Sequence, residues 1–231
     1  MITGAGRGIG FDASLALAAS PENTVLALGR DAGKLAALAA KARELYSHDN
    51  LRTLQFDVTQ PDESAFKELV EQAGGLDTLI NNAGFMVRKP FETLDPEDWR
   101  MVYETNVLGP AWLIRLALPY LRKSSRPHVV NIGSMGGFQG SGKFPGLSVY
   151  SSSKAAIASL TECLAEEFKK ERIVFNCLAL GAAQTDMLAE AFPGYKAPLT
   201  SAQMGGFVAW FAAEGGKYFN GKVLPVSLST P

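Results

Sequence analysis

The sequence has few of the residues that build disulfides or metal sites. Of its 231 residues, only two are cysteine and two are histidine. Cys163 and Cys177 occur without a secretion signal, so we expect two thiols and not a disulfide. His48 and His128 are isolated, and no group of side chains has metal-ligand spacing. We therefore expect no structural metal.

Long apolar runs and blocks of one charge are also missing. The most apolar stretch, GPAWLIRLALPYL (109–121), is interrupted by Arg115 and falls short of the roughly 18 residues of a membrane span. The opening MITGAGRG lacks the apolar core of a signal peptide. The formal net charge is -1, without a basic cluster. We expect a cytoplasmic protein with a small-molecule substrate, which binds neither membranes nor nucleic acid.

Strand-like and helix-like segments alternate along the chain. Expected strands are 24–29, 51–58, 76–81, 127–133, 172–180 and 221–227; expected helices are 9–19, 32–47, 62–73, 96–122, 151–170 and 201–213. Near-continuous apolar strands are typical of a parallel sheet covered on both faces. The alternation predicts an α/β fold, a doubly wound Rossmann-type parallel sheet with helices on both faces, in a single domain over 1–231.

The first strand of this sheet is poorly represented. Only Met1 and Ile2 come before the glycine-rich stretch TGAGRGIG, whereas a central strand needs about five residues. Either the strand is short or residues upstream of Met1 are missing from the sequence.

The glycine-rich stretch itself predicts a phosphate-binding turn. It contains Gly4, Gly6, Arg7, Gly8, Ile9 and Gly10. Glycines let the backbone turn sharply and approach a ligand closely, and the helix that follows points its N–H groups at the ligand. A tight turn without a ligand is the alternative, but the position between a strand and an apolar helix favours a dinucleotide.

Other polar or small residues follow the remaining predicted strands. They are Arg30, Asp57, Val58, Asn82, Ala83, Gly84, Ser134, Gly181 and Thr185. In open α/β sheets, ligands bind outside the carboxyl ends of the strands. We therefore expect these residues to surround one site.

The segment YSSSK places Tyr150 and Lys154 four residues apart, on one face of a helix. A tyrosine has a reference pKa of about 10, and an ammonium within about 4–6 Å lowers it by about 1–3 units. Such a phenol can act as a general acid or base. With Ser134 holding a substrate oxygen, the pair suits reduction of a carbonyl, or oxidation of an alcohol, beside a bound nicotinamide.

These motifs resemble those of the short-chain dehydrogenase/reductase family, in its common single-domain branch. TGAGRGIG resembles the family's TGxxxGxG, residues 81–84 its NNAG, and YSSSK its YxxxK. ETNVLG (104–109) and VNIGSMGG (130–137) place Asn106 and Ser134 at two further family positions. The resemblance covers nearly the whole chain.

The resemblance implies roles for a catalytic tetrad. Tyr150 would donate a proton to the substrate carbonyl, and Lys154 would lower the tyrosine pKa and bind the nicotinamide ribose. Ser134 would orient the carbonyl, and Asn106 would hold a water that links Lys154 to solvent. For Asn106, the alternative is that it satisfies a buried helix kink.

The resemblance also implies contacts to the cofactor. Asp57 would accept a hydrogen bond from the adenine amino group, with the Val58 backbone beside it. Asn82 and its neighbours would line the adenine ribose, and Thr185 would bind the nicotinamide carboxamide. Asp57 could instead cap a turn, and Thr185 could instead cap the next segment.

Charge near the end of the second strand favours NADP(H) over NAD(H). In the family, Gly29 stands where NAD-preferring members tend to carry an aspartate. Arg30 follows it, and Arg7 lies in the glycine-rich stretch, so two guanidiniums could reach a 2′-phosphate. Asp31 leaves NAD(H) as the alternative if its side chain turns inward.

The substrate region departs from the family's usual pattern. The interval from Ser134 to Tyr150 is a few residues longer than usual, and the expected lid, 186–199, is shorter. Leu180-Gly181 replaces the usual PG, and the C-terminal DGG is missing. The expected pocket is apolar, which suits a hydrophobic carbonyl. Its residues are Phe85, Met86, Phe138, Phe144, Met187, Leu188, Phe192 and Tyr195.

The leading hypothesis is an NADPH-dependent reductase of a ketone or an acyl-thioester ketone. The first alternative is a 3-oxoacyl-acyl-carrier-protein reductase, for which Arg88, Lys89 and Lys143 could meet an acidic carrier. The second is a non-catalytic NADP-binding regulator, which the intact tetrad disfavours. The family resemblance implies a homodimer or homotetramer built from helices 96–122 and 151–170.

Overall fold

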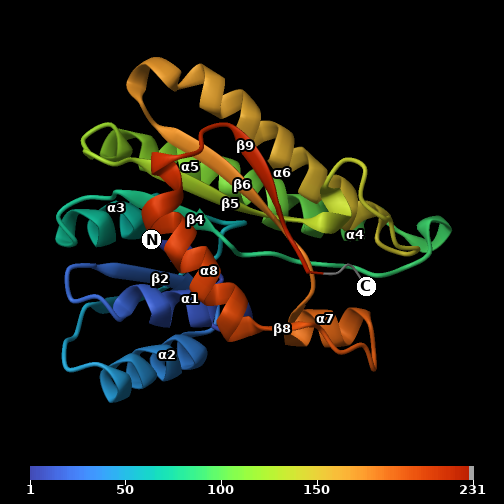
Figure 1. The fold of residues 1–231 in the computed structure, drawn as a ribbon, viewed down its shortest axis with the longest axis horizontal. Helices are drawn as coiled ribbons and strands as arrows, with labels where there is room; N and C mark the ends of the chain where they lie inside the picture. Colours follow the sequence, from blue (N-terminus) through green and yellow to red (C-terminus); the bar gives the residue numbers. More distant parts are fainter. Residues whose placement is uncertain (229–231) are drawn as a thin grey trace.

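Seven parallel strands form the sheet at the centre of the molecule (Figure 1), in the order β3-β2-β1-β4-β5-β6-β9. This computed structural model describes residues 1–228. The strands are β1 (Ile2–Thr3), β2 (Val25–Gly29), β3 (Leu51–Gln55), β4 (Thr78–Asn81), β5 (His128–Ser134), β6 (Val174–Leu180) and β9 (Lys222–Val226). The order turns back between β1 and β4, so a crevice opens there at the carboxyl ends of the strands.

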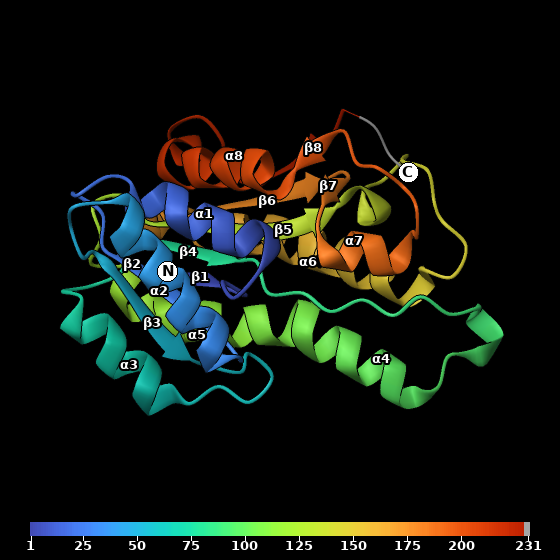
Figure 2. The ribbon, with the colours of Figure 1, turned by 90° about the horizontal axis from the view of Figure 1, so that it is seen from below.

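Helices cover both faces of the sheet (Figure 2). On one face lie α1 (Gly8–Ala18), α2 (Ala32–Leu45) and α8 (Ser201–Glu214). On the other lie α3 (Glu63–Gln72), α4 (Pro96–Tyr103), α5 (Gly109–Leu121) and α6 (Ser148–Glu167). The predicted doubly wound α/β fold is therefore confirmed.

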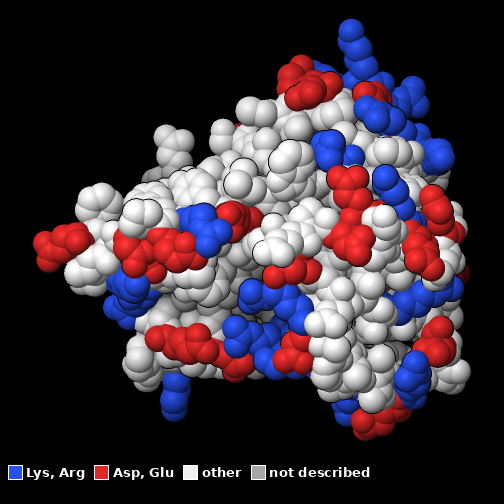
Figure 3. Space-filling view, turned by 180° about the vertical axis from the view of Figure 1, so that it is seen from behind, with Lys and Arg blue, Asp and Glu red and all other residues white. Residues whose placement is uncertain are grey.

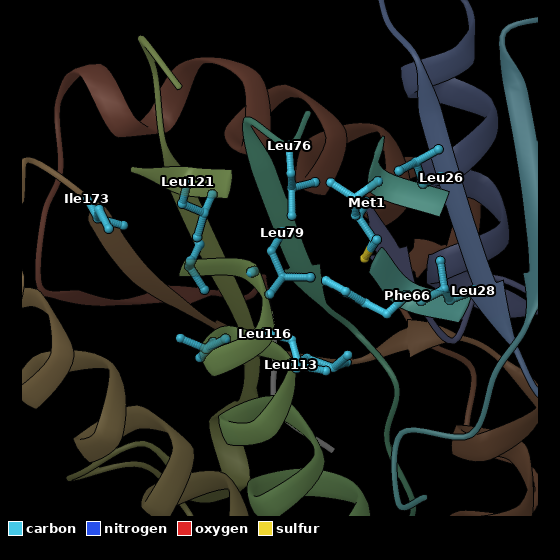
Figure 4. Close-up of a cluster of buried hydrophobic side chains, with 14 of the residues drawn as sticks. Met1, Leu26, Leu28, Phe66, Leu76, Leu79, Leu113, Leu116, Leu121 and Ile173 are labelled. Atoms are coloured by element: carbon cyan, nitrogen blue, oxygen red, sulfur yellow. The ribbon is translucent and has the colours of Figure 1, made fainter. Parts of the chain in front are cut away.

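The alternation of side chains along the strands divides the core into two layers. In β2, Leu26 and Leu28 belong to the layer of α3 and α5, whereas Val25 and Ala27 belong to the layer of α1 and α2. Figure 4 shows the first of these layers, where Leu28, Leu79 and Met1 surround the fully buried ring of Phe66. Both faces are apolar, which explains why the strands read as near-continuous hydrophobic runs.

The first strand is as short as its sequence suggests. Ile2 pairs with Ala27 on one side and with Ile80 on the other, and its side chain is fully buried. In the described residues, β1 thus bridges β2 and β4 and leads into the glycine-rich turn.

Two predicted boundaries differ from the structure near the site. The helix expected over 96–122 is divided by a π-helical turn, Glu104–Leu108, between α4 and α5. Pro110 has no N–H with which to bond the carbonyl of Asn106, so the regular α-helical pattern fails there. Helix α6 begins at Ser148, earlier than expected, which places Tyr150 in its first turn.

The expected lid contains its own secondary structure. Helix α7 (Asp186–Ala191) lies between β7 (Ala183–Gln184) and β8 (Leu199–Thr200), which pair in parallel outside the main sheet. These short elements stand at the carboxyl ends of the strands (Figure 1).

The surface mixes charges of both signs, as Figure 3 shows for the face behind that of Figure 1. Within residues 1–228, no helix is long and apolar enough to cross a membrane. The same residues contain no group of three or more His, Cys, Asp or Glu side chains that could hold a metal ion.

Candidate active site

A cavity of about 650 Å³ opens at the carboxyl ends of the strands. It extends from the glycine-rich turn and the end of β2 to the first turn of α6 and the 186–199 segment. All the sequence-predicted cofactor residues line it: Gly4, Gly6, Arg7, Gly8, Ile9, Gly10, Arg30, Asp57, Val58, Asn82, Ala83, Gly84, Tyr150, Lys154, Gly181 and Thr185.

The glycine-rich turn has room for no side chain at two of its positions. Gly4 has φ +68°, and a Cβ there would lie 2.8 Å from the Ala83 Cα. A Cβ on Gly10 would lie 2.4 Å from both Asn82 Nδ2 and the Gly4 oxygen. Asn82 Nδ2 donates to the Thr3 oxygen at 2.9 Å and so fastens the turn to β4. The cradle therefore fits a pyrophosphate at the start of α1.

Arg7 does not point where the sequence suggested. Its guanidinium pairs with Asp186 at 3.6 Å and with Glu190 at 4.0 Å, both on α7. The expectation that Arg7 and Arg30 converge on one phosphate is therefore not met in this conformation, because the acids of α7 attract Arg7 toward the lid.

Away from the 186–199 segment, Lys34 lines the cavity together with Arg30. Gly6 packs against Lys34, since a Cβ on this glycine would lie 3.2 Å from the lysine Cβ. Asp31 is the N-cap of α2, and its Oδ1 accepts from the Lys34 N–H at 3.0 Å. Sequence reasoning missed Lys34, although its place in the first turn of a capped helix could have indicated it.

Asp57 and Thr185 both serve as local caps. Asp57 Oδ1 accepts from the Thr59 N–H at 2.9 Å and from the Thr59 hydroxyl at 2.8 Å. The Thr185 hydroxyl caps α7 by accepting from the Leu188 N–H at 3.3 Å. Each residue thus makes the cap that was its alternative interpretation, and both residues also line the cavity.

Tyr150, Ser134 and Lys154 meet where β5 ends against α6. The Ser134 hydroxyl accepts from the Gly136 N–H at 3.1 Å, and Ser134 lies close enough to the Tyr150 phenol to lower its pKa. Lys154 is 4% exposed, and its Nζ donates to the Ile132 carbonyl at 2.7 Å. The same Nζ lies 5.8 Å from the centre of the Tyr150 ring.

Burial shifts the pKa values of both Tyr150 and Lys154. It raises the pKa of Tyr150, against the opposing effect of Ser134. It also lowers the pKa of Lys154 to about 8. Lys154 is not among the causes that shift the tyrosine pKa in the protein alone, so the expected lowering by Lys154 is not seen there, and Tyr150 stays protonated at neutral pH.

The Asn106 side chain serves the protein interior. Its Oδ1 accepts from the Phe85 N–H at 2.8 Å, while its Nδ2 donates to the Phe85 oxygen and to Ser153 Oγ, each at 2.9 Å. Asn106 does not line the cavity as the described residues form it. The alternative interpretation, a side chain that satisfies a buried helix kink, fits Asn106. A proton-relay water would therefore have to bind the Asn106 backbone carbonyl, to which Pro110 has no N–H to donate.

Five of the predicted pocket residues line the substrate end of the cavity: Met86, Phe144, Met187, Leu188 and Phe192. The other three predicted residues do not line this cavity as the described residues form it. Phe85 packs with Val87 and Val102 instead, Phe138 ends the short helix after β5, and Tyr195 lies in the turn after Phe192. Thr105, Leu147 and Gln184, which sequence reasoning missed, also line the cavity.

An aromatic contact closes this end. The rings of Phe144 and Phe192 meet edge to face, with their centres 5.6 Å apart. Arg88 lies 4.7 Å from the centre of the Phe192 ring and donates to the Ala191 carbonyl. The extra residues before Tyr150 therefore bring Phe144 against the lid.

The chain is similar to proteins of one family. A family model described as short chain dehydrogenase matches residues 1–196. A 3-oxoacyl-[acyl-carrier-protein] reductase, FabG, of Aggregatibacter actinomycetemcomitans is 35% identical over 196 residues, which cover 84% of this chain and 79% of that protein. An uncharacterized oxidoreductase of Staphylococcus saprophyticus is 33% identical over 199 residues, with 81% and 74% covered.

Among solved structures, a 3-ketoacyl-(acyl-carrier-protein) reductase from Brucella melitensis, complexed with NADH, superposes with a TM-score of 0.85. The alignment covers 97% of this chain and 94% of that chain at 23% identity. A likeness at this identity shows the fold.

Proposed function

The chain belongs to the short-chain dehydrogenase family and is an oxidoreductase, and from this premise we propose that it reduces a carbonyl group on a hydrophobic substrate with NADPH. One observation carries the proposal. Tyr150, Ser134 and the buried Lys154 line the same cavity as the glycine-rich turn. A dinucleotide held at that turn can thus reach the proton donor.

The side chains have separable tasks in the reduction. NADPH supplies the hydride when it is bound. Tyr150, which is protonated at neutral pH, gives its phenolic proton to the carbonyl oxygen, which becomes the alcohol hydroxyl. The Ser134 hydroxyl hydrogen-bonds the same oxygen, and the Lys154 ammonium stabilises the phenolate that remains. We propose that a water bound at the Asn106 carbonyl helps to return a proton to the Tyr150 phenolate.

The preference for NADPH is supported at the far end of the cavity. Arg30 and Lys34 both line it, and cations there favour a 2′-phosphate. The Asp31 carboxylate, which would favour the free ribose of NADH, has one oxygen committed to capping α2. NADH remains the alternative cofactor.

A free hydrophobic ketone or a short acyl thioester is the proposed substrate. The cavity is apolar at its substrate end, and the contact between the Phe144 and Phe192 rings limits the length of the cavity there. The FabG relative favours a carrier-bound 3-oxoacyl chain as the second candidate. Against a carrier, Lys89 already pairs with Asp98 at 2.7 Å, and Lys143 donates to the Phe138 carbonyl at 2.7 Å.

We also propose a cellular location and an oligomeric state for the enzyme. A cytoplasmic location suits Cys163 and Cys177, which are both free thiols. A homodimer or homotetramer built from α4, α5 and α6 is supported by Leu108 and Trp112, which are half-exposed on this part of the surface. Large apolar side chains of this kind are common in subunit contacts.

The test is cofactor oxidation with NADPH and NADH across three substrate groups: hydrophobic ketones, acyl thioesters of coenzyme A and the same acyl groups on an acyl carrier protein. We expect turnover that favours NADPH, and Arg30→Ala should reduce that preference. Faster turnover of the carrier-bound group would select the alternative. Tight NADPH binding without turnover of any substrate would favour the regulator.

A further inference from the structure

Arg7 connects the cofactor cradle to the lid. It belongs to the glycine-rich turn, yet its guanidinium pairs with Asp186 and Glu190, at the two ends of α7. The Thr185 side chain also packs beside the turn, since a Cβ on Gly8 would lie 3.4 Å from Thr185 Cγ2. The turn and the lid therefore meet through both packing and charge.

This arrangement creates a competition for one guanidinium. Arg7 and Asp186 both line the cavity, whereas Glu190 reaches Arg7 from the next turn of α7. A 2′-phosphate held near Arg30 and Lys34 would be a third anion within the same cavity. Arg7 cannot make its full set of contacts with the two carboxylates and with a phosphate at once.

We propose that Asp186 and Glu190 determine cofactor specificity by holding Arg7 away from the 2′-phosphate of NADPH. This inference rests on the proposed function, in that it requires a nicotinamide dinucleotide in the cavity. The two acids lower the affinity for NADPH more than that for NADH. By reciprocity, NADPH that captures Arg7 weakens the attachment of α7 to the turn.

The test is a set of dissociation constants for NADPH and NADH, measured by fluorescence titration without substrate. All three side chains are exposed by half or more, so the variants should keep the fold. In Asp186→Asn/Glu190→Gln, we expect NADPH to bind about three- to tenfold more tightly, the scale of two exposed ion pairs. NADH affinity should change by less than about twofold, and the NADPH gain should shrink at high salt.

Two further variants identify the route of the effect. In an Arg7→Ala background, the same acid substitutions should leave NADPH affinity unchanged, because the acids act through Arg7. The control is Glu166→Gln/Glu167→Gln at the far end of α6, which removes the same charge outside the cavity and should leave both constants unchanged.

Three results would overturn the inference. An unchanged NADPH-to-NADH ratio in the acid variant would remove the role of α7. An equal gain in the Arg7→Ala background would show that the acids repel the phosphate directly. Wild-type protein that binds neither nucleotide would remove the proposed function and this inference with it.

Discussion

Lys154 is a cation that the protein keeps almost entirely from solvent. Its hydrogen bond to the Ile132 carbonyl satisfies one of its three donors. Burial lowers its pKa to about 8, so it is charged at neutral pH and loses that charge in mildly alkaline solution. Its support for the Tyr150 phenolate is therefore conditional on pH.

We predict an alkaline limb near pH 8 in kcat/KM for carbonyl reduction, because deprotonated Lys154 cannot stabilise the phenolate. Tyr150 has a raised pKa and contributes only at higher pH. Lys154→Arg, which stays charged, should lose the limb near pH 8 while retaining some activity. An identical limb in that variant would assign it to another group.

The sequence predicted that Tyr150, Lys154 and Ser134 lie in one cavity, because helical spacing and the ends of strands determine their positions. It predicted Arg7 and the Asn106 side chain poorly. Arg7 pairs with acids about 180 residues away in the chain, and Asn106 bonds the Phe85 backbone and Ser153 across two other segments. Such contacts depend on tertiary placement, which local patterns do not encode.

At the scale of elements, the buried side chain of His128 connects β5, which carries it, with α8 and β6. It lies on β5, 4% exposed, and its Nδ1 is 3.1 Å from the Ala212 carbonyl of α8. Its Nε2 lies 3.1 Å from Asn176 Nδ2 of β6. The carbonyl requires a proton on Nδ1 and the amide requires a lone pair on Nε2, so this ring is neutral.

We predict that acid destabilises the fold through His128. Burial lowers its pKa from 6.5 to about 4. Between these values the unfolded chain binds a proton that the folded chain does not, so the free energy of unfolding falls as pH drops from 6.5 to 4. The expected loss from this residue is about 3 kcal/mol.

Urea unfolding of wild type and His128→Gln between pH 4.5 and 7 measures this contribution. The variant should be less stable at pH 7 and should show a weaker dependence on pH in this range. Equal slopes for both proteins would mean that other groups cause the acid sensitivity.

Element order was predictable because the alternation of apolar strands and helices extends along the whole chain. The divided helix at Glu104–Leu108 was not predicted, although Pro110 is a local signal for it. The β7–β8 pair was also missed, since two-residue strands leave no periodic pattern and Gln184 pairs with a residue beyond the lid.

At the scale of the whole molecule, one cavity links segments from nearly the full length of the chain. The glycine-rich turn, the ends of β2, β4 and β5, the first turn of α6 and the start of α7 all line it. The switch in strand order between β1 and β4 brings these ends together. In the proposed reduction, the glycine-rich turn and the Tyr150 proton donor are thus on different elements, so removal of the Tyr150 hydroxyl tests proton donation apart from binding at the turn.

The most direct test of this assignment is a single-turnover reduction by enzyme loaded with NADPH, in wild type and Tyr150→Phe. The substrate is the best one from the panel. We predict that the variant binds NADPH as tightly as wild type but reduces the carbonyl about 10²- to 10⁴-fold more slowly, the usual contribution of a general acid. A variant that binds NADPH normally and reduces at the wild-type rate would contradict the role of Tyr150 as proton donor.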